Sequence, residues 1–188
     1  MINISYKDII TPQLLQGAIE NNEMHGFRQD FHILHCLIKI HQPKTFLEIG
    51  TNVGRGISII SNAGQSFNIK CYSLDLPPEL SHYSLQYPGN SIGSLCKLPF
   101  IQLLANSLEF DYSSIYPMEG FFIDGEHDFL HANYESKEAI KSQAKLIIWH
   151  DADMPPVMSA ILDAFDNNTD YDLYRVIDTR MAYALRKQ

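Results

Sequence analysis

A short run of residues in the first third of the chain constrains the fold more than any other feature. Phe46-Leu47-Glu48-Ile49-Gly50-Thr51-Asn52-Val53-Gly54 passes from an apolar segment through an acid into a glycine-rich turn, and a helix-compatible segment, 57–63, follows. Strand, glycine turn and helix in this order are typical of the first unit of a nucleotide-binding α/β fold. Glycines let the backbone approach a ligand closely, because no Cβ stands in the way.

The acid in this run discriminates between nucleotide cofactors. A carboxylate facing the turn would repel the pyrophosphate of NAD, but it would attract a cofactor whose end carries a sulfonium and an ammonium group. Glu48 therefore indicates S-adenosylmethionine, with Gly50, Asn52 and Gly54 in the loop that would hold it.

Strands and helices alternate from Lys44 onward. Short, almost continuously apolar segments predict parallel strands that are covered on both faces. These segments are Thr45–Ile49, Ile69–Leu74, Phe100–Leu104, Gly120–Ile123 and Lys145–Trp149. Helices are expected over 12–22, 30–41, 130–142 and 156–165. Only Thr179-Arg180 joins the last two strands, Leu173–Asp178 and Met181–Arg186, so these strands form an antiparallel hairpin.

These elements predict an α/β fold with a doubly wound, Rossmann-like sheet. The sheet is expected to have seven strands, mostly parallel with a C-terminal antiparallel hairpin, in the order 3-2-1-4-5-7-6 when strands are numbered along the chain. The 188 residues suffice for one well-buried domain and are too few for two. We expect residues 1–43 to form an N-terminal helical cap and residues 44–188 to form the cofactor-binding core.

Composition narrows the partners and the compartment. A net charge of -8 argues against nucleic acid, which needs a basic face. The apolar runs have the length of strands, so no membrane span is expected. The N-terminus lacks a signal-peptide pattern, and three scattered cysteines read as reduced thiols of a cytoplasmic protein. A homo-oligomer is compatible with the sequence.

Further polar residues follow the strands at the edge where a cofactor would bind. Asp75 ends the second strand about 20 residues beyond the glycine loop, where an acid can accept ribose hydroxyls. Alternatively, it initiates the turn before Pro77-Pro78. Asn106 and Ser107 follow the third strand, where an adenine edge would lie. The long segment 76–98 is either a substrate lid or a surface loop.

Two acidic motifs follow the fourth and fifth strands. Asp124 and Asp151 come together if these strands are neighbours, and their repulsion favours a bound cation, Mg²⁺ or Mn²⁺. The alternative is that both acids cap helices. His127 could deprotonate a hydroxyl substrate, or it could only hydrogen-bond its loop. His127 and His131 have the spacing of a zinc-protease helix, but Asp128 replaces the usual Glu.

The motifs around Glu48, Asp75, Asp124 and Asp151 resemble those of class I S-adenosylmethionine-dependent methyltransferases. Within that class the chain is similar to methyltransferase family 24, which includes macrocin-type sugar O-methyltransferases and cephalosporin-hydroxylase-like proteins. The quoted motifs are Leu47-Glu48-Ile49-Gly50 with Gly54, Ile123-Asp124-Gly125-Glu126-His127 and Trp149-His150-Asp151, and the resemblance covers Lys44 to the C-terminus.

The resemblance implies methyl transfer to a hydroxyl of a small molecule, such as a sugar or a natural-product intermediate. It also implies an S-adenosylmethionine site over Glu48, Gly50, Gly54, Asp75, Asn106 and Ser107, and we expect Asp124 to contact the cofactor as well. Metal-dependent relatives hold a divalent cation through an Asp after strand four and an Asp-Asn pair after strand five. Asp124 and Asp151 match the acids, but Ala152 replaces the Asn, which leaves the third ligand to His150, Asp153 or water.

The resemblance further places His127 where relatives have a base lysine, so His127 or Asp124 would take the proton. Two rival functions stay open: a hydroxylase-like or NAD-linked enzyme on the same fold, and a non-catalytic binding or assembly subunit. Residues 22–30 and 76–98 are expected to shape the acceptor pocket.

Overall fold

The computed structural model describes residues 1–18, 28–80 and 91–187, and an eight-stranded sheet lies at its centre. The strands are β1 (Ile2–Ser5), β2 (Thr45–Ile49), β3 (Lys70–Asp75), β4 (Ile101–Leu104), β5 (Gly120–Ile123), β6 (Leu146–Trp149), β7 (Tyr171–Ile177) and β8 (Ala182–Arg186). Their order across the sheet is β1-β7-β8-β6-β5-β2-β3-β4.

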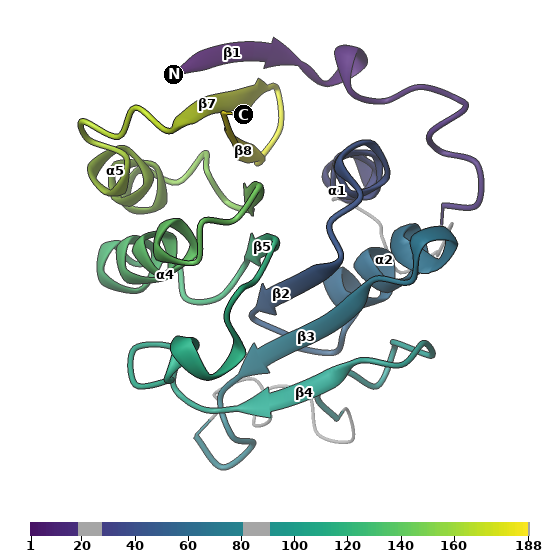
Figure 1. Cartoon of the computed structure of the whole chain (residues 1–188), viewed down its shortest axis with the longest axis vertical. Coiled ribbons are helices and arrows are strands. Elements are labelled where there is room, and N and C mark those ends of the chain that lie inside the picture. The colour runs from purple at the N-terminus through teal and green to yellow at the C-terminus, as the bar shows by residue number, and fades with distance from the viewer. Residues whose placement is uncertain (19–27, 81–90, 188) are drawn as a thin grey trace.

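Two pairs of helices cover the sheet. The helices are α1 (Arg28–His41), α2 (Arg55–Gly64), α4 (Phe129–Lys141) and α5 (Pro155–Ala164), with short 3-10 helices at Tyr6–Asp8, Gln65–Phe67 and Tyr112–Ile115. Helices α1 and α2 pack on one face, and α4 and α5 pack together on the other (Figure 1). Within the described ranges, no helix is long and apolar enough to cross a membrane.

The predicted strand order is confirmed, with one strand added. The core pairings from β4 to β6 are parallel, and β8 runs antiparallel to both β6 and β7. The prediction of seven strands was wrong because β1 pairs in parallel with β7, Ile2 lying opposite Tyr174. An edge strand of four residues that is half exposed carries no continuous apolar run, so its sequence gives no strand signal.

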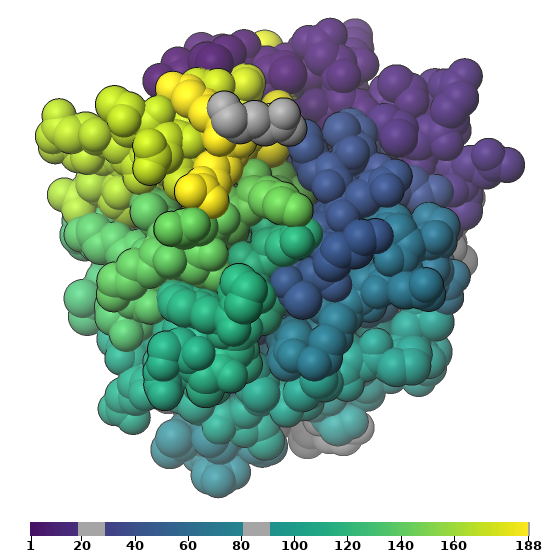
Figure 2. Space-filling view, in the orientation of Figure 1, coloured from purple at the N-terminus to yellow at the C-terminus, as the bar shows by residue number. Residues whose placement is uncertain are grey.

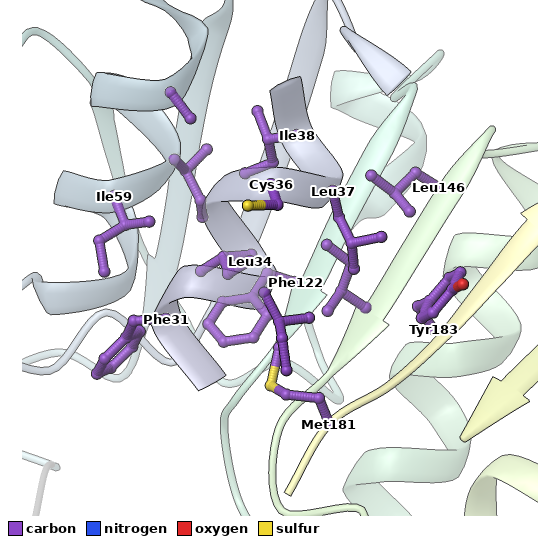
Figure 3. Close-up of a cluster of buried hydrophobic side chains, with 14 of the residues drawn as sticks. Phe31, Leu34, Cys36, Leu37, Ile38, Ile59, Phe122, Leu146, Met181 and Tyr183 are labelled. Atoms are coloured by element: carbon purple, nitrogen blue, oxygen red, sulfur yellow. The ribbon is translucent and has the colours of Figure 1, made fainter. Parts of the chain in front are cut away.

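Successive side chains of a buried strand point to opposite faces of the sheet, so each such strand contributes to two cores. Phe122 of β5 belongs to the core beneath α1 and α2, while its neighbours Phe121 and Ile123 belong to the core beneath α4 and α5. The same alternation separates Ile148 from Trp149 in β6. Figure 3 shows side chains of α1 gathered with Phe122 and Leu146 of the sheet and with Tyr183 of β8. Apolar residues on both faces of a strand are what a doubly covered parallel sheet requires.

The expected helical cap over residues 1–43 is corrected in two ways. Strand β1 joins the sheet, and α1 buries its apolar face in the core instead of lying over it. In the space-filling view the N-terminal segment lies against the C-terminal hairpin (Figure 2). In place of a helix over 12–22, residues 12–17 form turns that end at Gly17 with a φ of 80°, and 19–22 lie outside the described residues.

The long segment after β3 is described only at its ends. Residues 81–90 lie outside the described residues, as do 22–27 of the expected acceptor region, so the lid prediction stays a prediction. At the described end, the amide of Gly93 donates to the carbonyl of Asn52 at 2.9 Å, and the amide of Leu95 donates to the carbonyl of Val53 at 2.9 Å. These two hydrogen bonds hold this end of the segment against the glycine loop.

Gly50 is expected to be far less tolerant of alanine than Gly17. Both glycines have a left-handed φ, 94° and 80°, which costs an L-residue about 1–2 kcal/mol. A Cβ on Gly50 would stand 2.1 Å from the carbonyl oxygen of Asp124, whereas a Cβ on Gly17 would meet nothing within 4 Å. Urea unfolding should show Gly50→Ala destabilised beyond Gly17→Ala by about 1–3 kcal/mol. Equal losses would show that the clash relaxes freely.

Candidate active site

The glycine loop begins where β2 ends, between the carboxyl ends of its two parallel neighbours. The Gly50 amide donates to the carbonyl of Leu74 at 2.8 Å, and the Asp124 amide donates to the carbonyl of Ile49 at 2.9 Å. The Cα of Gly50 rests against the Asp124 carbonyl, where no Cβ fits. These contacts bring the ends of β2, β3 and β5 to one rim, which is where ligands bind in open α/β sheets.

A cavity of about 580 Å³ opens at this rim. That volume suits a small-molecule ligand or cofactor. Six of the predicted cofactor residues line it, namely Gly50, Asn52, Asp75, Asn106, Ser107 and Asp124. The predicted base His127 lines it as well. Residues that follow four different strands thus meet around one space, and their role in holding a cofactor stays a prediction.

Asp75 stands at one side of this cavity in a position suited to a ribose. Its Oδ2 accepts the Asn52 amide at 2.7 Å, and its Oδ1 accepts the Leu76 amide at 2.7 Å. Burial raises the pKa of Asp75, and backbone N–H groups of Asn52, Leu76 and Thr51 oppose the shift. A carboxylate has about four acceptor sites, so one is left that can accept a ribose hydroxyl. Asn52 reaches its position with a left-handed φ of 48°.

The structure places Glu48 and Gly54 away from both described cavities. Glu48 is 1% exposed, and its Oε2 accepts the Ser73 hydroxyl at 2.5 Å beneath the start of α2. Burial raises the pKa of Glu48 well above its usual range. Gly54 precedes α2 with a φ of 92° and packs against Gly93. The geometry therefore favours indirect support of the glycine loop by Glu48 over direct contact with a cofactor, and direct contact stays a prediction.

A second cavity of about 250 Å³ has walls in common with the first, among them Gly50, Asp124 and His127. It is lined further by His150, Asp151 and Arg180, and by Phe31 of α1. Asp124 and His127 line both cavities. A ligand in each cavity could therefore contact the same two side chains.

His150 lies under this junction as a buried cation. Its Nδ1 is 2.9 Å from Asp151 Oδ2 and 3.2 Å from Asp124 Oδ1, and its Nε2 is 3.3 Å from Asp30 Oδ2 on α1. Burial alone would lower the pKa of His150, but the three carboxylates raise it to about 11. A metal ligand must offer an unprotonated nitrogen. In this structure both ring nitrogens of His150 face carboxylates, and its role as a metal ligand stays a prediction.

Asp151 is the most heavily engaged acid of the site. Its Oδ2 is 2.9 Å from His127 Nε2 as well as from His150, and its Oδ1 forms an ion pair with Arg180 at 2.9 Å. Burial opposes ionisation of this carboxyl, but the two histidines hold its pKa well below the usual range. In return, the hydrogen bond to Asp151 raises the pKa of His127 against a smaller opposing effect of burial. His127 and Asp151 form an oriented His–Asp pair at the cavity wall.

The donor atoms of Asp124, His127 and Asp151 lie within 4.8 Å of one another and could hold a metal ion. Oxygen-rich ligands suit Mg²⁺ or Mn²⁺, and these three side chains fit such an ion if His127 turns its Nε2 from Asp151 to the metal. Repulsion between the carboxylates no longer demands a cation, however, since His150 and Arg180 already supply positive charge. This set of donor residues contains His127, where the sequence analysis expected His150.

Sequence reasoning missed Asp30, Arg180 and Glu135. Asp30 opens α1 and Arg180 sits in the β7–β8 turn, 120 and 29 residues from His150 and Asp151, so no local motif marks them. Glu135 could have been singled out from the sequence, because it is an acid on the face of α4 that is buried. The zinc-protease reading finds no support, since His131 Nδ1 pairs with the N-cap residue Asp128 at 2.9 Å.

Known structures share this fold, although no protein-family model and no curated protein matches the chain. An O-methyltransferase from Bacillus cereus in complex with S-adenosylhomocysteine (SAH) matches 96% of this chain and 94% of its own, at a TM-score of 0.64 and 14% identity. TomG, an O-methyltransferase from Streptomyces achromogenes involved in tomaymycin synthesis and bound to S-adenosylmethionine, covers 95% and 91%, at 0.62 and 14%. SAH-bound PaMTH1, a methyltransferase from Podospora anserina, covers 95% and 89%, at 0.62 and 11%.

At these identities the likeness shows a common fold. The chain has the Rossmann-like fold of these methyltransferases over nearly its whole length, with the antiparallel hairpin at the C-terminal end of the sheet.

The stability of this protein is expected to depend on pH through Glu135. Burial raises the pKa of this carboxyl to about 8 from 4.5, so the folded state holds the proton more tightly than the unfolded chain. The contribution is fully present below about pH 4.5 and is lost as pH rises through about 8. Unfolding in urea from pH 4 to 9 should show wild type losing more than about 1.4 kcal/mol relative to Glu135→Gln. Parallel curves would contradict the assignment.

Proposed function

We propose that this chain is an S-adenosylmethionine-dependent O-methyltransferase that acts on a hydroxyl of a small molecule. One observation carries the proposal: a single cavity joins an acid suited to a ribose, Asp75, to a His–Asp pair, His127 with Asp151. The first feature binds a nucleoside, and the second can remove a proton from a hydroxyl. The Bacillus and Streptomyces proteins of the same fold are O-methyltransferases by name, and their complexes with SAH and S-adenosylmethionine support the choice of cofactor.

S-adenosylmethionine would supply a methyl group on a sulfonium, ready for direct transfer to a nucleophilic oxygen. The chain would contribute position first. Asp75 would hold the ribose, and the glycine loop would let the backbone lie against the cofactor. The acceptor would enter from the smaller adjoining cavity and place its hydroxyl at the wall that both cavities share. Fixing the two reactants in line lowers the entropic part of the barrier.

The chain would also remove the proton. In its neutral form, His127 can accept the proton of the acceptor hydroxyl, and Asp151 orients the ring and stabilises the cation that results. Arg180 and His150 hold Asp151 ionised, so that it cannot itself compete for the proton. The acceptor is proposed as a sugar or a natural-product intermediate.

Binding of SAH should depend on Asp75. Removing a charge-assisted hydrogen bond costs about 1.5–3 kcal/mol, so Asp75→Ala should weaken the affinity by roughly tenfold to a hundredfold. Glu109→Ala removes an exposed acid outside both cavities and is the matched control, and Glu48→Gln tests the indirect role of Glu48 with a smaller expected loss. Titration calorimetry measures all three. Stronger binding of NAD than of SAH, or equal affinity in Asp75→Ala, would overturn the cofactor assignment.

The finer proposal is that one divalent cation assists the transfer. Asp124, His127 and Asp151 would hold it, and it would lower the pKa of the acceptor hydroxyl and orient that group. His127 cannot be a metal ligand and a base in the same turnover, because its lone pair serves only one of these purposes. Removing the metal therefore separates the two roles.

Methyl transfer from labelled S-adenosylmethionine should fall at least about tenfold in chelator, and Mg²⁺ or Mn²⁺ should restore it better than Zn²⁺. Asp151→Asn should show the same loss without rescue, whereas Asp166→Asn, an exposed acid that lines neither cavity, should keep the metal response. Full activity in chelator with SAH binding intact would rule the cation out and leave His127 as the base. A panel of sugars and phenols serves as acceptors.

A further inference from the structure

A deeply buried carboxyl lines the larger cavity together with Asp75. Glu135 of α4 is 1% exposed and lines this cavity together with Asn106 and Ser107. Neither of its carboxyl oxygens has a partner of good hydrogen-bond geometry among the described residues, and only the Ser107 hydroxyl, which also lines the cavity, interacts with the carboxyl as a hydrogen-bond donor. A buried carboxyl whose hydrogen-bonding capacity is largely unused is energetically unfavourable, so a group of this kind calls for a function.

Another glutamate of the same helix shows what a structural acid looks like. Glu138 is 7% exposed, accepts the Tyr116 hydroxyl at 2.8 Å and forms an ion pair with Lys141. It does not line either described cavity. Glu135 lacks these partners, although it lies one helical turn away and is buried more deeply.

The surroundings of Glu135 favour its neutral form. Burial raises its pKa to about 8, and the negative charges of Asp128 and Glu126 add to this shift, while the nearby Ser107 hydroxyl opposes it. A neutral carboxyl offers one acceptor, its C=O, and one donor, its O–H, side by side. That pair complements a ligand edge on which a donor stands next to an acceptor.

The route of the cavity places a nucleobase at this carboxyl. A ribose held by Asp75 at the end of β3 would direct its base towards the end of the next strand, β4, where Asn106 and Ser107 line the wall. Glu135 lies at this part of the wall, because its carboxyl interacts with the Ser107 hydroxyl. A Cβ built on Gly125 would lie 3.5 Å and 3.8 Å from the two carboxyl oxygens, so the glycine leaves that side of the carboxyl uncovered.

We infer that Glu135 recognises the adenine ring of the cofactor through its amidine edge, with the C=O accepting the N6 amino group and the O–H donating to N1. Adenine presents a donor beside an acceptor on this edge, which is the complement of a neutral carboxyl. Glu135 is thus a specificity-determining residue for the base. This inference rests on the proposed function, since it assumes an adenosine cofactor in the larger cavity.

The test compares SAH with its purine analogue, in which a hydrogen replaces the N6 amino group. This analogue keeps N1 as an acceptor but offers no donor to the C=O of Glu135, and turning the carboxyl over cannot restore one. Wild type should prefer SAH by at least about tenfold, one lost hydrogen bond being worth about 1.4 kcal/mol. Glu135→Leu should lose most of this preference, mainly through weaker binding of SAH. Glu135→Gln should keep the preference, because an amide offers the same acceptor and donor.

Glu138→Leu is the matched control, since it removes a buried carboxyl from the same helix away from the cavity, and its preference should equal that of wild type. If Glu135→Leu does not fold, Glu135→Asp draws the carboxyl back by one methylene and should lose the preference too. Equal weakening of both ligands in the Glu135 variants would show a structural role and overturn the inference.

The failures of the two proposals can be told apart. Binding of SAH by wild type without preference over the purine analogue would overturn the role of Glu135 and leave the proposed function standing. Failure of wild type to bind either ligand would overturn the proposed function, and the inference with it.

Discussion

The contact between Gly50 and the carbonyl of Asp124 is the constraint on which the rest of the site depends. Strands β2 and β5 pair in parallel up to Ile49 and Ile123, and the chain after β2 can turn only because Gly50 has no Cβ to meet that carbonyl. The turn sends α2 to one face of the sheet, while the end of β5 leads to α4 on the other (Figure 1). The larger cavity lies between the start of α2 and the end of β5. The close packing of Gly50 against the Asp124 carbonyl therefore decides where a ligand can lie.

Charge balance sets the chemistry of the second cavity. Three carboxylates, those of Asp30, Asp124 and Asp151, converge on His150, and Arg180 adds a further positive charge. These partners come from α1, from the ends of β5 and β6, and from the β7–β8 turn, so the ion pairs also fasten these elements to one another. These ion pairs engage the buried carboxylates and leave His127, which is more exposed, as the group that can exchange protons with a ligand.

Much of the fold could be predicted because the sequence patterns that indicate it lie within short segments. The apolar strands β2 and β5 have the predicted bounds, and β6 begins one residue later than predicted, because a strand covered on both faces must be apolar throughout. The short link at Thr179-Arg180 correctly predicted the antiparallel pair. Strand β1 was not predicted, because an edge strand needs only one partner strand and few apolar residues. Asp75, Asn106, Ser107, Asp124 and His127 were found from their places after strands, since parallel strands bring such positions to a common rim.

By itself, the sequence determined the α/β class, the order of the core strands and which strand ends meet at the cavity, since periodicity, glycine positions and link lengths are properties of neighbouring residues. The tertiary structure decided which charges meet. It placed Glu48 beneath the loop, surrounded His150 with three carboxylates, brought Arg180 to Asp151 and left the carboxyl of Glu135 largely unpaired at the cavity. Burial and pairing between distant segments fix a side chain's charge and direction, and these depend on how helices pack on a finished sheet.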